Sequence, residues 1–585
     1  MDVPVHWLSY CYDNPERGRW DQLFIERCLA GDEGHPPYGV SFHDATPQEL
    51  ASNVGRVIVF PCGHYAECGS IDMAFERLRD YVNELDWALV IATSDECQAF
   101  PWERFDALPE HMGLWVQLGR PDKEYPFGTR FFGEGPPVSA RDQNLDAVTR
   151  DLDVFFSGQG GHERRDQFFA AARNIDANLK TRIARTGGFT QGLPHEEYLH
   201  TLARSWVAPA PAGICSPSSF RAFEALEAGC IPILDNGNVT SDFDDTTYWE
   251  LIGMDGVAPT IDYWRDLPTM VDSLLVNRCE TAARCSSRWQ QYKRRLLQQL
   301  NWDVLALHGD PVIEAGPWDM ITVIIPTSPV PSNPSLEMIQ NTVQSIRIDL
   351  PGAEILITCD GVRDEQLDRA DDYHVFLHRL CMWTNTQHNV WPIISPTHRH
   401  QSGMMFDALS LVRTHFVLYV EHDAPLEGVI PWADVLRTMA DSDLNSMRFL
   451  HETHIPPGSE LLFLDHAALP AQEDTAPFVR TIQWSQRPHL ARTDWYRRVM
   501  FDHFDPEART FIEDVMHGVV QAGTYAGRKR ALEAWERWRM AVYAPEGSWK
   551  RSGHYNGRAE DPKFPMYMKY PNGQRPEGAP PEGWQ

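Results

Sequence analysis

The stretch CSPSSFRAFEALEAGCIPIL, residues 215–234, contains the start of a helix, its end and the strand that follows. Ser218 or Ser219 provides an N-cap, since a serine side chain accepts a hydrogen bond from the first free amides of a helix. The pattern predicts a helix over Phe220–Ala228 that stops at a glycine, and the apolar run Ile231–Leu234 predicts the next strand. A helix that leads directly into a buried strand is typical of parallel α/β sheets.

The same alternation extends to both sides of this stretch. From about residue 50 to residue 310, short apolar runs alternate with longer segments of helical periodicity. Apolar positions at helical spacing over 268–300 predict a long helix at the end of this region. The predicted strands are Val57–Phe60, Ala88–Thr93, Leu114–Leu118, Val154–Ser157, Trp206–Ala208 and Ile231–Leu234.

A second α/β pattern begins after 301–319, a segment with two glycines and two prolines. MITVIIPTSP (320–329) predicts a strand, and a helix over Ser335–Ile348 follows it. Further strands are predicted over Ala353–Cys359 and His415–Val420. The pattern again indicates a parallel sheet.

These patterns predict an α/β protein of several domains. We expect one Rossmann-like half at 1–150 and a second at 151–312, divided by a Pro- and Gly-rich connection. A third α/β domain is expected at 313–522, and the helix and extended basic tail of 523–585 are expected to cover it.

The composition limits the classes of function. The 585 residues carry a net charge of −30, and 43% of them are hydrophobic, as in a soluble globular protein. An acidic surface repels a phosphate backbone, so DNA is not expected as a partner. The N-terminus lacks the pattern of a secretory signal, and no apolar run is long enough to span a membrane. Eleven cysteines without a dense framework fit reduced thiols, so a cytoplasmic location is expected; a Cys62–Cys68 disulfide or metal pair is the less favoured alternative.

The helix predicted at 220–228 has the chemistry of an anion site. Its free amides and positive dipole end suit a diphosphate, and Arg221 adds a charged donor in the first turn. Glu224 lies three residues further along on the same face, where a carboxylate can accept hydrogen bonds from a ribose. The alternative is an amphipathic helix with an Arg–Glu pair on its surface.

The spacing S-x-x-S-x-R-x-x-E-A-L-x-x-G-C-I-P over residues 216–232 resembles the donor-site motif of the exostosin family of glycosyltransferases. VFFSGQGGHERR (154–165) is similar to a second segment of that family. The resemblance covers about residues 50–300 and implies a GT-B pair of Rossmann-like domains that needs no metal. It implies that Arg221 contacts the donor diphosphate, Glu224 the ribose, and Arg164 or Arg165 a second phosphate. The motif also contains Ser219, at the start of the helix. No acceptor base is identified in this half; the candidates are Glu33, His35, His64 and Asp95.

The second half has two carboxylates after a strand. Glu421 and Asp423 follow the run HFVLYV at positions i and i+2, so both leave the sheet edge on the same side. Divalent cations prefer such oxygen ligands. A solvated strand end is the alternative, because an E-x-D pattern is common by chance.

The strand VIIPT and the later ILITCDG resemble the nucleotide-binding start of GT-A glycosyltransferases. The resemblance implies that Asp360 contacts the base or ribose and that E-x-D replaces the D-x-D element. Asp423 is then the expected ligand of Mn²⁺ or Mg²⁺, and Glu421, where the family carries Asp, is expected to contact the donor.

Two later features fit the same family. ARTFIEDVMHGVV predicts a helix that begins near Glu513 and Asp514, and acids of this kind provide the base that deprotonates an acceptor hydroxyl; Asp514 is preferred and Glu513 second. An acidic first turn that stabilises the helix is the alternative. His554, in a Gly-flanked loop, resembles the C-terminal histidine that completes the metal site. The segment 524–575 has eleven Lys and Arg against five Asp and Glu, which suits a phosphate-bearing donor.

Two further clusters, one polar and one aromatic, each have two interpretations. His398, Arg399 and His400 either line a donor or acceptor pocket or belong to a solvated loop. Trp535 and Trp538 lie at helical spacing and are expected to pack on a core, although tryptophans can also stack on a sugar.

Two nucleotide-sugar sites in one chain predict a bifunctional glycosyltransferase that acts on a protein or glycan hydroxyl. The resemblance to soluble enzymes of this kind includes bacteriophage enzymes that modify virion proteins, in which case the location is the host cytoplasm. The alternatives are glycosylation of modified bases in DNA, or one active domain joined to a glycan-binding or scaffold half.

Overall fold

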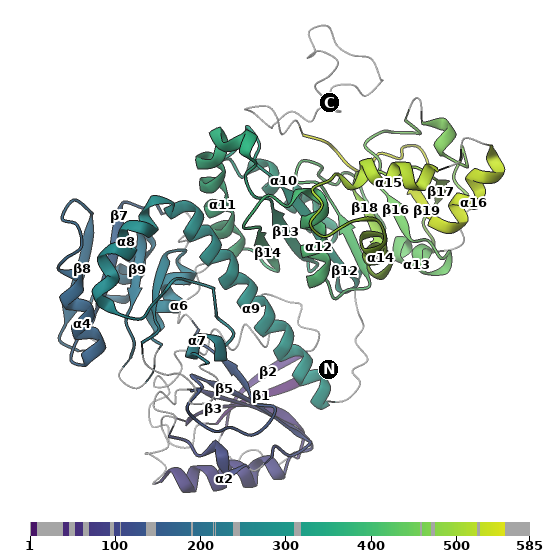
Figure 1. Ribbon diagram of the computed structural model, residues 1–585. Coiled ribbons are helices and arrows are strands. Elements are labelled where there is room, and N and C mark those ends of the chain that lie inside the picture. Colours follow the sequence, from purple (N-terminus) through teal and green to yellow (C-terminus); the bar gives the residue numbers. More distant parts are fainter. Residues whose placement is uncertain are drawn as a thin grey trace. The chain divides into compact units, whose positions relative to one another are not determined.

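The computed structural model describes residues 2–8, 39–45, 53–62, 70–93, 99–105, 107–135, 148–188, 191–213, 216, 218–237, 246–308, 317–456, 459–469, 474–522, 524 and 527–555. It confirms an α/β fold (Figure 1). The sheet expected to be parallel in the second half is mixed, because three of its pairings are antiparallel. The chain divides into two compact units. Unit 1 comprises residues 1–314 together with 381–388, and unit 2 comprises 315–380 and 389–585. The finer four-part division stays a prediction.

The first sheet of unit 1 has six parallel strands in the order β2-β1-β3-β4-β5-β6. Helix α2 (Ile71–Asn83) begins at Ser70, whose hydroxyl accepts a hydrogen bond from the Met73 amide at 3.2 Å. Its apolar face packs on β3 and β4. The strands are β1 (Asp2–Leu8), β2 (Gly39–Ala45), β3 (Arg56–Pro61), β4 (Ala88–Thr93), β5 (Met112–Gln117) and β6 (Arg130–Phe132), and the short helix η2 (Trp102–Arg104) follows β4.

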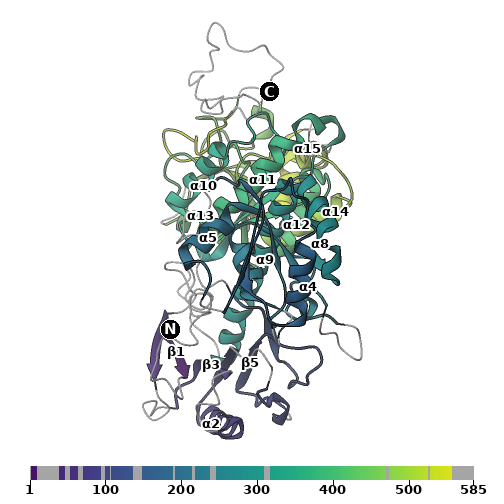
Figure 2. The ribbon, with the colours of Figure 1, turned by 90° about the vertical axis from the view of Figure 1, so that its left-hand side faces the viewer.

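The second sheet of unit 1 has five parallel strands in the order β11-β10-β9-β7-β8. Figure 2 shows this sheet edge-on, with α5 on one side and α4 and α8 on the other. The strands are β7 (Leu152–Gln159), β8 (Thr181–Thr186), β9 (Ser205–Ala210), β10 (Ile231–Asp235) and β11 (Thr260–Ile261). The helices are α4 (Glu163–Ala172), α5 (His195–Ala203), α6 (Phe220–Glu227), α7 (Tyr248–Leu251), η4 (Trp264–Asp266) and α8 (Leu267–Val276).

The helix expected over 268–300 is two helices. Helix α8 ends at Val276, because Asn277 has φ −118° and ψ 42°, outside the helical region. Asparagine has a low helix propensity, since its side chain competes with the backbone for hydrogen bonds. Helix α9 (Arg278–His308) then continues to the end of the unit. Its buried Trp289 and Tyr292 join a core that includes residues of both sheets of unit 1.

Unit 2 is built on an eight-stranded sheet of order β14-β13-β12-β15-β18-β16-β19-β17. Strands β12 to β15 are parallel, and β18 runs antiparallel to both β15 and β16. Beyond them, β19 is parallel to β16 and β17 is antiparallel to β19. The strands are β12 (Ile321–Thr327), β13 (Glu354–Cys359), β14 (Val390–Ile394), β15 (Phe416–Tyr419), β16 (Ser446–Arg448), β17 (Phe478–Thr481), β18 (His489–Arg492) and β19 (Met540–Tyr543).

The helices of unit 2 follow the expected alternation with strands. They are η5 (Pro317–Met320), α10 (Glu337–Asp349), η6 (Asp364–Arg369), α11 (Ala370–Asn385), α12 (His400–Leu411), α13 (Trp432–Asp441), η7 (Glu460–Leu462), α14 (Thr493–His503), α15 (Ile512–Gln521) and α16 (Arg528–Trp538). Trp535 and Trp538 of α16 are buried, as the core interpretation predicted. No helix in the described part of the chain is long and apolar enough to cross a membrane.

Candidate active sites

The N-terminus of α6 in unit 1 is ordered by its own serines. Ser219 is the N-cap by backbone geometry, but its side chain caps no amide, and its buried hydroxyl has no partner among the described residues. The amide of Ser218 donates to the Ser216 hydroxyl at 3.1 Å, and the Ser218 hydroxyl donates to Glu134 at 3.1 Å. The Ser219 hydroxyl is therefore a buried polar group without a partner among the described residues, at the start of the helix.

Arg221 lies across the end of strand β7. Its Nε donates to the Ser157 carbonyl at 2.9 Å, and its guanidinium carbon lies 5.2 Å from the centre of the Phe156 ring. A Cβ on Gly158 would lie 2.5 Å from Arg221 Nη2, so a glycine is needed at this crossing. Within the described residues the two terminal nitrogens of Arg221 donate to no protein group, which leaves them for an anion.

Glu224 does not form the surface ion pair considered from the sequence. Its side chain is buried and accepts a hydrogen bond from the Tyr198 hydroxyl at 2.8 Å. Burial raises the pKa of Glu224, and the nearby charge of Arg221 opposes this rise. A buried carboxylate with one bonded oxygen retains a second oxygen as an acceptor.

The structure uses Arg164 and Arg165 internally. Arg164 forms a bidentate pair with the buried carboxylate of Asp235 and also donates to the Asp262 carbonyl at 3.1 Å. Arg165 is buried and donates to the carbonyls of Ala212 and Gln159 at 3.1 and 3.2 Å. The second phosphate contact suggested by the resemblance would require these bonds to break.

Asp235, at the end of β10, is a residue that the sequence analysis missed. Besides Arg164, its carboxylate accepts from the Trp264 indole at 2.8 Å and from the amides of Ala212 and Gly237 at 3.1 Å. It thus connects the segments that follow β9 and β10 at the carboxyl edge of the sheet. An acidic residue directly after the strand IPIL is the only sequence signal for this role. The acceptor-base candidates Glu33, His35, His64 and Asp95 lie outside the described residues.

In unit 2, Asp360 follows β13 and holds the segment after β14. Its buried carboxylate accepts from the amides of Gly361, Arg399 and His400 at 2.9, 2.6 and 3.2 Å. The His398 Nδ1 lies 2.8 Å from the same carboxylate. The histidine-rich segment is therefore fixed by Asp360, and that carboxylate is already surrounded by protein donors.

Glu421, Asp423 and His554 meet beyond the end of β15. His554 Nε2 lies 3.6 Å from the Asp423 carboxylate, and the Tyr555 amide donates to the Asp423 carbonyl at 2.6 Å. Burial, together with the charges of Asp423 and Glu513, raises the pKa of Glu421 well above its usual range. The described residues contain no group of three His, Cys, Asp or Glu side chains that could hold a metal ion.

The two acids at the start of α15 lie in different surroundings. Glu513 is partly buried, accepts from the Gln486 amide at 3.0 Å and is close enough to Glu421 to raise its pKa. Asp514 is exposed. Of the two predicted bases, Glu513 is the one whose charge acts on the other acids of this site.

Arg487, beside these acids, was not identified from the sequence. Arg487 forms an ion pair with Glu452, and the charge of Arg487 lowers the pKa of Glu421. Arg487 lies in the connection between β17 and β18, and no local motif marks that connection. This arginine therefore adds positive charge to a site otherwise dominated by carboxylates.

Comparison with known proteins gives matches to solved structures only. No protein-family model and no curated protein matches the chain. Residues 1–349 of S. aureus TarS have 15% identity over 40% of this chain and 59% of that one, with a TM-score of 0.25. GalNAc-T7 with UDP, GalNAc and Mn²⁺ has 11% identity over 39% and 44%, with a TM-score of 0.26. The mannosyltransferase PcManGT from Pyrobaculum calidifontis, with GDP-Man and Mn²⁺, has 12% identity over 47% and 70%, with a TM-score of 0.26. This chain thus spans less than two thirds of TarS and GalNAc-T7.

Proposed function

We propose that the chain is a glycosyltransferase with one nucleotide-sugar site in each unit, acting on a protein or glycan hydroxyl. One observation carries the proposal most strongly. Three segments that are distant in the sequence meet at the end of β15. The first contributes Glu421 and Asp423, the second Glu513 and the third His554. Ligands of open α/β sheets bind at the carboxyl ends of the strands. Carboxylates and an imidazole at that edge suit a donor that departs as a metal-bound diphosphate.

The pair Asp423 and His554 fits Mn²⁺ or Mg²⁺. The Nε2 atom of His554 lies 3.6 Å from the Asp423 carboxylate, so one cation could be held by both side chains. Such ions commonly take one or two protein ligands and complete their shell with phosphate oxygens and water. When bound, the cation would neutralise charge on the departing diphosphate.

Glu513 is the base in this proposal. One of its oxygens is held by the Gln486 amide, which leaves the other to take a proton. The acceptor oxygen forms a bond to the anomeric carbon of the sugar, and the bond from that carbon to the diphosphate breaks. The hydroxyl proton moves to Glu513. A direct displacement of this kind inverts the anomeric configuration.

In this proposal Asp360 contributes indirectly, because it holds the segment that follows β14. Because its carboxylate is bonded to the backbone at 399–400, it fixes that segment and His398 at the carboxyl edge of the sheet. We propose that the nucleoside contacts this ordered segment, in place of the direct contact with Asp360 that the sequence suggested.

Unit 1 has the elements of a metal-independent donor site. The free nitrogens of Arg221 and the Ser219 hydroxyl lie at the N-terminus of α6, where a diphosphate is stabilised by amides and the helix dipole. The second oxygen of Glu224 would accept from the ribose. Arg164 and Arg165 position the surrounding loops in this proposal.

The test is nucleotide release by the full chain from UDP-, GDP- and dTDP-sugars, with simple glycosides, Ser/Thr peptides and a phage virion protein as acceptors. We expect one activity that EDTA abolishes and one that it does not. Asp423→Asn and Glu513→Gln should remove the EDTA-sensitive activity, Glu513→Gln by about 10²–10⁴-fold. Arg221→Met should remove the other. Asp514→Asn, at an exposed position of the same turn, is the matched control and should retain both.

Three outcomes would count against this proposal. Absence of turnover with every donor and acceptor would contradict it as a whole. If Arg221→Met changes nothing, unit 1 is a binding or scaffold half. Turnover that depends on DNA would instead support the glycosylation of modified bases, against the expectation from the net charge of −30.

A further inference from the structure

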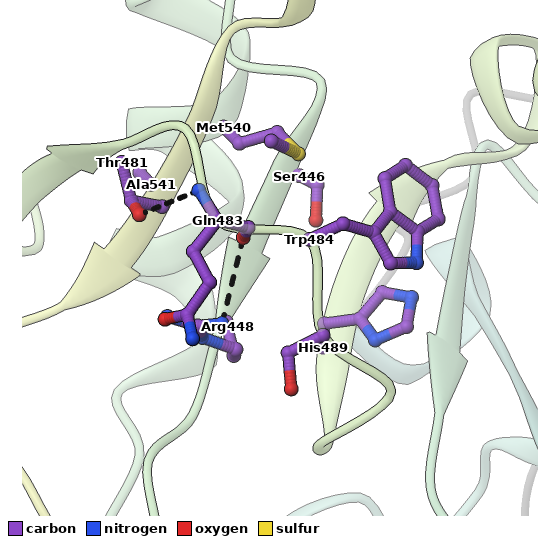
Figure 3. Close-up of a pocket in the computed structure, with 9 residues that line it drawn as sticks. Ser446, Arg448, Thr481, Gln483, Trp484, His489, Met540 and Ala541 are labelled. Carbon is purple, nitrogen blue, oxygen red and sulfur yellow. Dashed lines mark hydrogen bonds between the residues drawn. The ribbon is translucent and has the colours of Figure 1, made fainter. Parts of the chain in front are cut away.

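A small pocket lies within unit 2 between β16, β19 and the connection from β17 to β18 (Figure 3). Its cavity volume, taken for the centre of a water molecule, is about 20 Å³. This is room for one water molecule or one monoatomic ion, and it excludes a sugar or a nucleotide. The lining residues are Ser446, Arg448, Thr481, Gln483, Trp484, Ser485, His489, Met540 and Ala541.

Arg448 provides a buried cation in the wall of this pocket. Its side chain is only 4% exposed, and its two terminal nitrogens donate to the carbonyl and side-chain oxygens of Gln483 at 3.5 and 3.0 Å. Its Nε has no hydrogen-bond partner among the described residues. Figure 3 shows Arg448 and Gln483 on one side of the pocket, and Trp484 and His489 on the other. A buried guanidinium with one unpaired donor therefore lines a pocket that fits a single small species.

The charged groups that act on Arg448 in the described part of the chain form no direct ion pair with it. Glu452, Glu513 and Arg487 are the ionised side chains that act on it. Glu452 is already paired with Arg487, and Glu513 accepts from the Gln486 amide. In the described part of the chain neither acid forms an ion pair with Arg448. Burial and the charge of Arg487 lower the pKa of Arg448 to about 9, although Glu513 and Glu452 oppose this change.

We propose that this pocket binds a single halide-sized anion, chloride under ordinary conditions, beside Arg448. Water in the pocket would leave the buried charge without an ion pair, and a buried charge is costly unless it is paired. A carboxylate or phosphate exceeds the available volume. Ser485 accepts a hydrogen bond from the Arg487 amide at 3.4 Å, so its own proton can be donated to the anion.

The anion would also affect the position of Glu513, the proposed base. Gln483, Trp484 and Ser485 line the pocket, and the next residue, Gln486, holds the carboxylate of Glu513. A filled pocket would stabilise this segment in the position that orients Glu513.

The first test measures thermal unfolding of the full chain while sodium chloride replaces sodium gluconate at constant ionic strength. We expect a saturable rise in Tm of about 2–4 °C with chloride and with bromide, because a ligand that binds only the folded state stabilises it. Arg448→Met should lose this response. Arg437→Met, at a half-exposed arginine of α13, is the matched control and should keep it.

The second test is the anomalous signal of crystals of the full chain grown or soaked in bromide. We expect a peak inside the pocket beside Arg448. Equal Tm values in chloride and gluconate, with no anomalous peak in the pocket, would mean that it holds only water and would overturn the proposal. A halide-dependent Tm with the peak at another place would overturn it as well. Should Arg448→Met fail to fold, the wild-type titration and the bromide map decide the question.

Discussion

At the scale of single residues, Gly361 is fixed by a close backbone approach. A Cβ at this position would lie 2.3–2.6 Å from backbone atoms of Thr397 and His398, which no side-chain rotation can relieve. We expect Gly361→Ala to displace the segment that Asp360 holds and to lower the free energy of unfolding by about 2–3 kcal/mol. Urea denaturation measures this change, and the KM for the donor should rise as well.

Gly518 is the matched control for that substitution. It lies in α15, and no described atom would come within 4 Å of an added Cβ. Because alanine is the better helix former, Gly518→Ala should raise stability by up to about 1 kcal/mol. Equal effects of the two substitutions would show that the contact at Gly361 is not as close as the structure has it.

His489 makes stability depend on pH. Burial lowers the pKa of His489 from its ordinary 6.5 to about 4, so the folded protein keeps this imidazole neutral. The unfolded chain takes up the proton below pH 6.5, so the stability is present above that pH and is lost as the pH falls toward 4. The loss amounts to at most about 3 kcal/mol.

The pH effect is measured by denaturation at pH 7 and at pH 4. Wild type should lose about 3 kcal/mol more over this range than His489→Gln, which has no imidazole to protonate. His466→Gln, at an exposed position, should behave as wild type. A parallel pH dependence of wild type and His489→Gln would contradict the assignment.

At the scale of elements, Gln401 joins α12, α15 and β15. Its side-chain oxygen accepts from the Ile512 amide at 2.8 Å, and its nitrogen donates to the Tyr419 hydroxyl at 2.8 Å. Ser402, the next residue, donates to the Ala508 carbonyl at 2.7 Å. These bonds fix the start of α15, and hence Glu513, against the sheet.

Gln401→Met removes both side-chain bonds at nearly constant volume. We expect a loss of about 1–3 kcal/mol in stability, because the buried Ile512 amide is left without an acceptor. The kcat of the EDTA-sensitive activity should fall at least tenfold, since a small displacement of a base is costly. Gln167→Met, at an exposed position of α4, should change neither quantity. An unchanged kcat would mean that Glu513 is positioned without Gln401.

At the scale of the whole molecule, each unit has its own hydrophobic core and should unfold separately. Calorimetry of the full chain should show two transitions. Asp235→Ala removes the buried carboxylate that pairs with the partly buried Arg164, so it should destabilise one transition by about 3–5 kcal/mol. Gly361→Ala should lower only the other transition.

An exposed ion pair provides the control for Asp235. Asp166 and Arg185 are both about half exposed, so Asp166→Ala should leave the two transitions unchanged. A single transition that every substitution lowers alike would show that the two units unfold as one.

Local sequence determined most of the α/β pattern. The run ALVIAT predicted β4 with its observed bounds, and the helix and strand after residue 219 were predicted to within one residue. Strand β8 was missed, because TRIART is largely polar and partly exposed at the edge of its sheet. Asn277 divided one apparent helix into two, since periodicity alone does not report a single non-helical residue.

The sequence by itself also determined which acids and which histidine stand near the ends of elements, because strand and helix signals act over a few residues. Only the tertiary structure decided how they are used. Arg164 and Arg221 give similar local signals, yet the buried carboxylate of Asp235 pairs with Arg164, whereas Arg221 forms no ion pair within the described residues. Glu513 and Asp514 are neighbours, yet only Glu513 acts on Glu421. The physical reason is that compensation of buried charge depends on partners distant in the chain, which the fold alone brings together.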